Sequence, residues 1–175
     1  ARAPADGYTI LSGHLGTNAL ATAFYPNLGY DPQKDFEPIG ISAEYPEVLV
    51  VRKDFPANNL KEFIAYVKAN ETKVNAAHAG VGSVSNVSCE LLNSVLGVKP
   101  VGVPFNGTGP AMNALVAGQV DYMCDQIVNA VPQINGGTIK AYAIATPERN
   151  PSLPNVPTTA EAGLPAFQAQ AWNAI

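Results

Sequence analysis

Short apolar runs alternate with helical segments through most of this chain, and that alternation constrains the fold more than any other feature. The expected strands are 74–77, 101–105, 120–123 and 140–145, and the expected helices are 84–96, 111–117 and 129–134. Glycines separate most of these elements, as is typical of short connecting turns. Strands that alternate with helices indicate βαβ units, so we expect an α/β fold with a largely parallel sheet.

The rest of the chain is less regular. Its expected elements are a strand at 8–11, a helix at 18–25 and β-rich runs at 36–41 and 48–51. Pro46 lies between the last two runs and predicts that no single uninterrupted strand covers both. Asn59 is the expected N-cap of a helix that follows it. Thr158 and Glu161 have the spacing of a capping box, which predicts a further helix near the end.

Composition excludes some classes of function. Hydrophobic residues make up 47% of the chain and charged residues 14%, so a substantial core is expected. The net charge is −4 and there is no basic run, which argues against binding to nucleic acid. No apolar stretch approaches the roughly 18 residues that a membrane-spanning helix needs.

Glycine-rich turns follow two of the expected strands, and each opens a helix. The first turn is Gly80–Asn86 and the second is Asn106–Ala111. Glycine lets a ligand approach the backbone closely, and the free N–H groups of a helix N-terminus favour a carboxylate or phosphate. Ser83 and Thr108 can add hydroxyl donors. The sequence therefore predicts that a small anion binds to backbone amides, although each turn alone is also compatible with a simple βα connection.

Motifs for nucleotide binding and for catalysis do not fit these turns. No Gly-Lys-Ser/Thr follows either turn, and the nucleophile elbow G-x-S-x-G is absent. His78 and Cys89 form a conceivable catalytic pair, but a strand-end histidine and a core cysteine are the better interpretation. No ligands have metal-binding spacing. We therefore expect no catalytic residues, no metal and no cofactor.

Other polar residues leave alternatives open. Asp125, at the carboxyl end of an expected strand, is either a hydrogen-bond acceptor for a ligand or a loop anchor. Cys89 and Cys124 form one disulfide in an oxidising compartment or remain two buried thiols, and the spacing does not decide between these states.

Several segments resemble one known family in the same order along the chain. These are Ala5–Thr9, Tyr30–Phe36, the Gly80–Ser83 turn, Val103–Ala111 with Ala114–Asp121, and Leu153–Thr158 followed by Glu161–Gly163 and Trp172. Together they resemble the extracytoplasmic solute-binding proteins of tripartite tricarboxylate transporters, the Bug (TctC-type) family. The resemblance covers essentially the whole chain.

The resemblance implies a periplasmic binding protein-like (type II) α/β fold, in which two lobes close on a ligand. Because family members are longer, it also implies that lobe one is incomplete here. Residues 1–44 plus 166–175 then form partial lobe one, and residues 45–165 form lobe two.

The implied ligand is a small organic carboxylate, either a dicarboxylate or an aromatic acid. The implied ligand-binding residues are His14 and Thr17 from lobe one, with Gly82, Ser83, Asn106, Gly107, Thr108 and Asp125 from lobe two. Many members have His where this chain has Asn86, so the role of that position differs here.

The resemblance implies a periplasmic, non-enzymatic protein that delivers its ligand to the membrane subunits of a tripartite transporter or to a sensor. It implies no contact with nucleic acid and no membrane insertion. The alternative is an α/β enzyme domain that binds an anionic cofactor or substrate on the same turns. A third possibility is that the shortened chain no longer binds ligand.

Overall fold

The computed structural model describes residues 1–175. The strands are β1 (Gly13–His14), β2 (Ile41–Arg52), β3 (Asn75–His78), β4 (Val101–Pro104), β5 (Tyr122–Gln126), β6 (Ile139–Ile144) and β7 (Gln170–Ala174). The helices are the π-helix η1 (Gly16–Leu20), α1 (Ala21–Phe24), α2 (Leu60–Ala69), the 3₁₀-helix η2 (Glu71–Lys73), α3 (Val84–Leu96), α4 (Thr108–Val116) and α5 (Ile127–Asn135).

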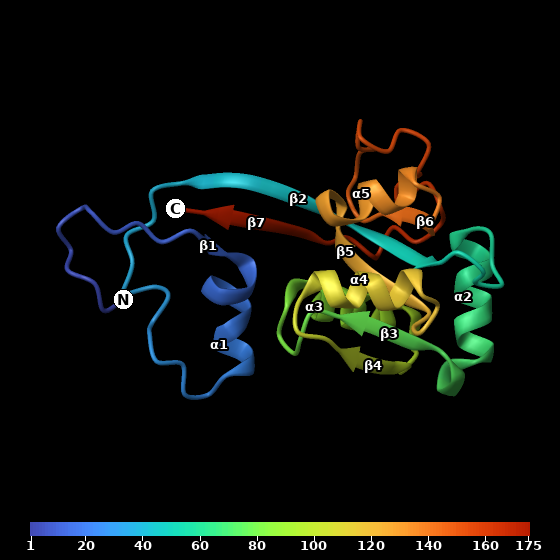
Figure 1. Cartoon of the computed structure of the whole chain (residues 1–175), viewed down its shortest axis with the longest axis horizontal. Coiled ribbons are helices and arrows are strands. Elements are labelled where there is room, and N and C mark those ends of the chain that lie inside the picture. Colours follow the sequence, from blue (N-terminus) through green and yellow to red (C-terminus); the bar gives the residue numbers. More distant parts are fainter.

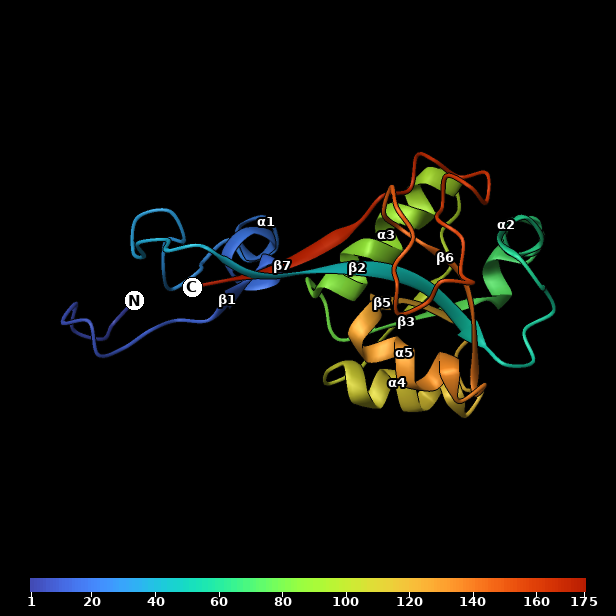
Figure 2. The same cartoon turned by 90° about the horizontal axis from the view of Figure 1, so that it is seen from above.

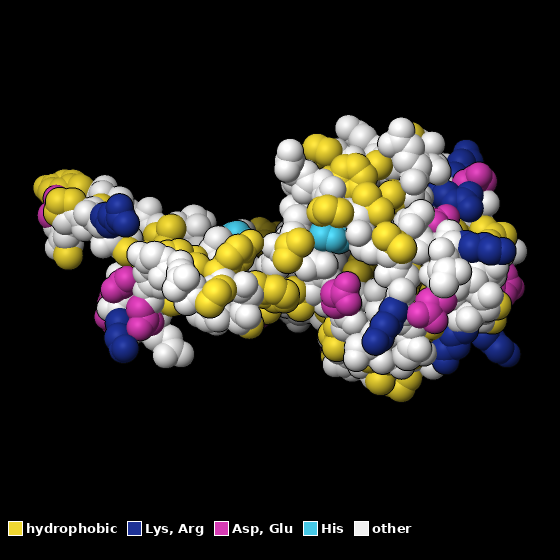
Figure 3. Space-filling view, turned by 90° about the horizontal axis from the view of Figure 1, so that it is seen from below, with side chains coloured by type: hydrophobic (Ala, Val, Ile, Leu, Met, Phe, Trp, Pro, Cys, Tyr) yellow, Lys and Arg dark blue, Asp and Glu magenta, His cyan; other side chains and the backbone are white.

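The molecule has a rounded body and a narrow arm, which Figure 1 and Figure 2 show from two sides. We call residues 1–44 and 170–175 the arm, and it carries β1, η1 and α1. Residues 45–169 form the body, which holds α2–α5. The ribbon of β2 and β7, which run side by side, joins the two parts. The space-filling view in Figure 3 shows the same narrow arm, with hydrophobic side chains along its surface.

One sheet runs through both parts, in the order β1-β7-β2-β5-β3-β4, with β6 also paired to β2. β3 is parallel to β4 and to β5, as the βαβ pattern predicts. β2, however, is antiparallel to β5, β6 and β7. The expectation of a largely parallel sheet is therefore wrong, because β2 enters from the arm and lies between β5 and β6. The α/β class is confirmed.

Pro46 does not interrupt the strand that contains it, so this prediction is also wrong. β2 is continuous over its 12 residues. Pro46 pairs only with Gln170 of β7, because pairing to β5 begins one residue later, at Glu47. A proline with a neighbouring strand on one side only can lack its N–H without breaking a ladder.

The predictions for the two ends of the chain also need correction. Residues 8–11 are not a strand: Tyr8 is 92% exposed, and β1 begins only at Gly13. β7 is absent from the expected strands, of which 140–145, now β6, is the last. Both errors have one cause, because the pairing of β1 and β7 joins residues far apart in the sequence.

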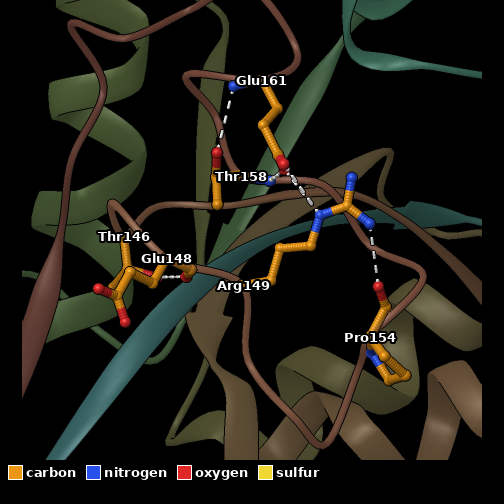
Figure 4. A network of polar contacts seen from close by, with 6 residues as sticks. All are labelled: Thr146, Glu148, Arg149, Pro154, Thr158 and Glu161. Carbon is orange, nitrogen blue, oxygen red and sulfur yellow. Dashed lines mark hydrogen bonds and ion pairs between the residues drawn. The ribbon is translucent and has the colours of Figure 1, made fainter.

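The capping box forms without a helix. The Thr158 amide donates to Glu161 Oε2 at 2.8 Å, and the Glu161 amide donates to Thr158 Oγ1 at 3.1 Å. Figure 4 shows Arg149 holding the same carboxylate, with Nε 2.8 Å from Oε2. Only turns follow. Gly163, at φ +92°, ends the helical geometry before a full turn can propagate.

The body buries one apolar cluster on each face of its sheet. One packs α2 and α3 onto residues such as Leu49, and the other packs α4 and α5 onto residues such as Val50. Both cysteines are free and buried, and the Cys124 amide donates to Cys89 Sγ at 3.0 Å. No helix has both the length and the apolar character needed to cross a bilayer.

Candidate functional site

The first glycine-rich turn is held by side chains of the helix that it opens. Gly80 and Gly82 have φ values of +113° and +76°, which favour glycine. The Gly82 amide donates to Asn86 Oδ1 at 3.0 Å, and the Asn86 amide donates to Ser83 Oγ at 3.2 Å. Asn86 is therefore the anchor of this turn, a role that the sequence analysis did not assign.

The start of α3 leaves donors available beside this turn. Ser83 is the N-cap, and α3 begins at Val84 as predicted. The Val84 and Ser85 amides donate to no backbone carbonyl. Such amides at a helix N-terminus, together with the helix dipole, favour an anion.

The second turn presents a longer run of free amides. Gly107, at φ +106°, is the N-cap of α4, and because it has no side chain it makes no side-chain cap hydrogen bond. The amides of Asn106, Gly107, Thr108 and Gly109 donate to no acceptor in the chain. Pro110 follows inside α4, where the missing N–H is harmless. Consecutive backbone N–H groups that point outward are the arrangement that binds carboxylates and phosphates.

The two turns lie side by side at one edge of the sheet. β3 and β4 are parallel, with His78 opposite Pro104, so both turns leave from the same end. The Phe105 amide donates to the His78 carbonyl at 2.9 Å. A methyl group placed on Gly80 would lie 3.7 Å from the Phe105 carbonyl oxygen. The structure thus brings Gly82 and Ser83 together with Asn106–Thr108, and their binding of a ligand stays a prediction.

The arm reaches the first turn directly. Tyr25 Oη donates to the Val81 carbonyl at 3.2 Å. A methyl group on Gly82 would lie 3.4 Å from Phe24 Cγ, and one on Gly16 would lie 3.9 Å from the Gly82 carbonyl oxygen. Sequence reasoning missed these arm residues because no local pattern marks a contact over more than 50 positions.

His14 and Thr17 lie at the start of the arm helix, near this contact. His14 Nδ1 accepts a hydrogen bond from the Gly16 amide at 3.0 Å. Thr17 Oγ1 donates to Asn18 Oδ1 at 2.7 Å. Both residues are exposed. Both side chains therefore face solvent on the arm, whereas the two glycine-rich turns belong to the body. Their role in ligand binding stays a prediction.

Asp125 has the loop-anchor role, one of the two that the sequence left open, and its role as a ligand acceptor stays a prediction. It is 2% exposed at the end of β5, and its Oδ1 accepts hydrogen bonds from the Gln126 amide at 2.8 Å and from Asn129 Nδ2 at 3.2 Å. This oxygen is a loop anchor. Oδ2 is buried without a partner. Burial raises the pKa of Asp125 to about 6, although both hydrogen bonds lower it.

His78 and Cys89 do not form a catalytic pair, and the strand-end acid Asp121 makes structural contacts. Cys89 Sγ accepts from the Cys124 amide, and no hydrogen bond joins it to His78. Asp121 holds Arg52 Nε at 2.9 Å and the Asn75 amide at 2.8 Å, which is a structural role. No group of three or more His, Cys, Asp or Glu side chains is placed to hold a metal ion.

These features define a class of protein. A sheet in which β2 runs antiparallel to its neighbours, glycine turns with free amides at the sheet edge and a second part joined by paired strands are typical of two-lobed solute-binding proteins. The chain belongs to the tripartite tricarboxylate transporter family receptors (TctC), whose pattern matches residues 1–175.

Individual relatives agree with this assignment. A UPF0065 protein of Agrobacterium vitis, from the TAR-I ttuE-ttuC' intergenic region, is 42% identical over 100% of this chain and 50% of its own length. MatC from Rhodopseudomonas palustris, solved with bound malate, is 56% identical with a TM-score of 0.91, over 98% of this chain and 58% of MatC. The periplasmic binding protein BugD is 44% identical with a TM-score of 0.91, over 99% of this chain and 57% of BugD.

The chain spans about half the length of the curated relatives it matches. The predicted family is confirmed. Because that family consists of receptors and its solved members are binding proteins, the interpretation as a binding protein rather than an enzyme is confirmed at the level of the family.

Proposed function

We propose that this chain captures a small organic carboxylate on the backbone amides of its two glycine-rich turns. The run of free amides from Asn106 to Gly109 carries the proposal. The free amides at the start of α3 lie in the adjacent turn, so the dipoles of two helices act on the same region. A net charge of −4 does not oppose this, because local amide dipoles act at short range.

The arm and the body act as the two sides of the site in this proposal. Residues 1–44 plus 166–175 belong to lobe one and contribute His14 and Thr17. Residues 45–165 form lobe two and contribute the two turns and Asp125. The contact from Tyr25 to the Val81 carbonyl supports this division, because it already joins the two sides beside the first turn.

The favoured ligand is a short dicarboxylate. MatC binds malate and is 56% identical to this chain. The turns suit one carboxylate, and in this proposal a hydroxyl or a protonated group at the far end of the ligand donates to Asp125 Oδ2, which is buried without a partner in the chain. An aromatic acid is the other ligand class that the proposal allows.

The proposed setting is the periplasm, where the protein passes its ligand to the membrane subunits of a tripartite tricarboxylate transporter or to a sensor. The family description supports the transporter, and the periplasmic relative BugD supports the compartment. Pull-down of the membrane subunits from solubilised membranes, with and without malate, tests this part separately.

The decisive experiment is a thermal-shift and calorimetric screen of malate, succinate, adipate, benzoate and inorganic phosphate. It uses this chain and a version extended to the length of its relatives. A carboxylate at 100 times its Kd should stabilise the protein by about 2.7 kcal/mol. Malamide, which lacks the negative charges, is the control. If no carboxylate shifts the melting of either version, the proposal is wrong; if only the longer version responds, the arm-side residues alone are insufficient.

A further inference from the structure

Glu47 is a buried acid without a partner. Its side chain is 1% exposed, and neither carboxylate oxygen makes a hydrogen bond. An ionised carboxylate in such a place is very costly, so the group is held as the neutral acid. Burial, and after it the nearby charge of Asp125, raise the pKa of Glu47 to about 8. Ser88 on α3 lowers it slightly without a hydrogen bond of normal geometry.

Glu47 lies at the root of the ribbon that joins the arm to the body. Before this residue β2 pairs only with β7, and from this residue on it pairs with β5. A closed ring of backbone hydrogen bonds forms here. The Glu47 amide donates to the Ala169 carbonyl at 3.2 Å, the Ala169 amide to the Ala145 carbonyl at 2.9 Å, and the Ala145 amide to the Glu47 carbonyl at 2.8 Å. The ring ties together β2, the end of β6 and the start of β7.

The titratable groups that face Glu47 are acids and thiols. β5 contributes Cys124 and Asp125, and α3 contributes Cys89 beside Ser88. The neighbouring residues of β6 and β7, Ala145 and Ala169, are not titratable. None of the groups that shift the pKa of Glu47 is basic. A negative charge at this position therefore has no counter-ion, and among the groups that shift this pKa only the Ser88 hydroxyl favours the charge.

We propose that Glu47 is a proton-binding site at the ribbon root, and that loss of its proton admits water, opens the backbone ring and loosens the arm against the body. The proton passes to solvent, and no other group changes. An effect of this opening on ligand capture rests on the proposed function, because the arm and the body can close on a ligand only if the ribbon root is rigid. The opening of the root itself does not depend on the proposed function.

The sign of the pH dependence follows from linkage. The closed root binds a proton more tightly than an open, hydrated root, whose Glu47 has an ordinary pKa near 4.5. Between that value and about 8, closing takes up one proton. The ratio of closed to open root therefore falls by up to about tenfold per pH unit in this window and levels off above it.

Hydrogen exchange without ligand tests the proposal directly. The amides of Glu47, Ala145 and Ala169 are followed from pH 6.5 to 8, where Asp125 has largely finished titrating, and rates are corrected for intrinsic exchange. We expect protection to fall by up to about tenfold per unit in the wild type and to stay constant in Glu47→Gln. Glu44→Gln, an exposed acid on the same strand, is the matched control and should behave as wild type.

Two further measurements keep the outcome clear. Carbon-13 NMR of the wild-type Glu47 carboxyl gives its pKa without any substitution, so a poorly folded Glu47→Gln does not stop the test. A pKa near 4.5, or equal pH profiles in wild type and Glu47→Gln, overturns the proposal. Malate affinity is then measured over the same pH range. If malate, succinate, adipate and benzoate all fail to bind at every pH, the proposed function alone is refuted, and the exchange result still decides on Glu47.

Discussion

Gly107→Ala should damage the second turn without any steric clash. Gly107 has φ +106° and ψ 172°, a region that is essentially restricted to glycine. No heavy atom lies within 4 Å of a methyl group placed there. The cost is therefore backbone strain alone, about 1–3 kcal/mol. For a chain of this size each kcal/mol lowers Tm by about 2–4 °C.

Gly109→Ala is the matched control, because it lies two residues away in the same turn. Its surroundings are equally empty, and its φ is not in the left-handed region. It is inside α4, where alanine is favoured over glycine by about 0.5–1 kcal/mol. Gly109→Ala should therefore leave Tm unchanged or raise it slightly.

The same pair of variants separates folding from binding. Strain at Gly107 turns the neighbouring amides away from their common direction, so malate affinity should fall by at least tenfold, equivalent to about 1.4 kcal/mol. In Gly109→Ala the amides keep their direction and affinity should stay within about twofold. The assays are calorimetric unfolding and isothermal titration. Equal losses in both variants, or no loss in Gly107→Ala, would refute the assignment of this turn as the anion site.

Three other substitutions test the surroundings of the site. Asp125→Asn keeps the anchoring oxygen but removes titration. Because the pKa of Asp125 is raised to about 6, wild-type stability should fall by about 2 kcal/mol more than that of the variant as the pH rises from 4 to 6, as urea unfolding will measure. Asn86→Ala leaves the Gly82 amide without its acceptor and should cost about 1–3 kcal/mol in the same assay, whereas the exposed Asn113→Ala on α4 should be neutral. Tyr25→Phe removes one exposed hydrogen bond between arm and body, so it should weaken malate binding a few-fold by titration while Tm hardly moves. An unchanged affinity in Tyr25→Phe means that the arm contact is irrelevant to capture.

Local sequence signals predicted the body of the fold well. α3 has the predicted bounds, with Ser83 as N-cap and Gly97 at φ +69° as its end. Asn59 caps α2 by accepting a hydrogen bond from the Glu62 amide, as expected. Caps and glycine stops are decided by a few adjacent residues, so a single sequence contains the information that they need.

The errors fall where pairing is not local. β2 runs through Pro46 because its partner strand on one side begins only at Glu47, which no neighbouring residue reveals. β7 becomes a strand because β2 and β1 lie on either side of it, and residues 8–11 do not because nothing in the chain pairs with them. Strand formation depends on partners more than on intrinsic preference.

In the candidate site, too, local features could be predicted and non-local ones could not. The two glycine-rich turns could be predicted, since each is one short motif. The positive φ angles of Gly82 in the first turn and of Gly107 in the second favour glycine at these positions. The burial of Glu47 could not be predicted, because its neighbours in the sequence indicate only that a charged residue precedes an apolar run. Its unpartnered burial arises where β2, β5, β6 and β7 converge. The parts that select an anion are therefore local, whereas the part proposed to control closure is a property of the assembled sheet. Variation in the turns should change which ligand binds, and variation at the ribbon root should change the pH at which any ligand is held.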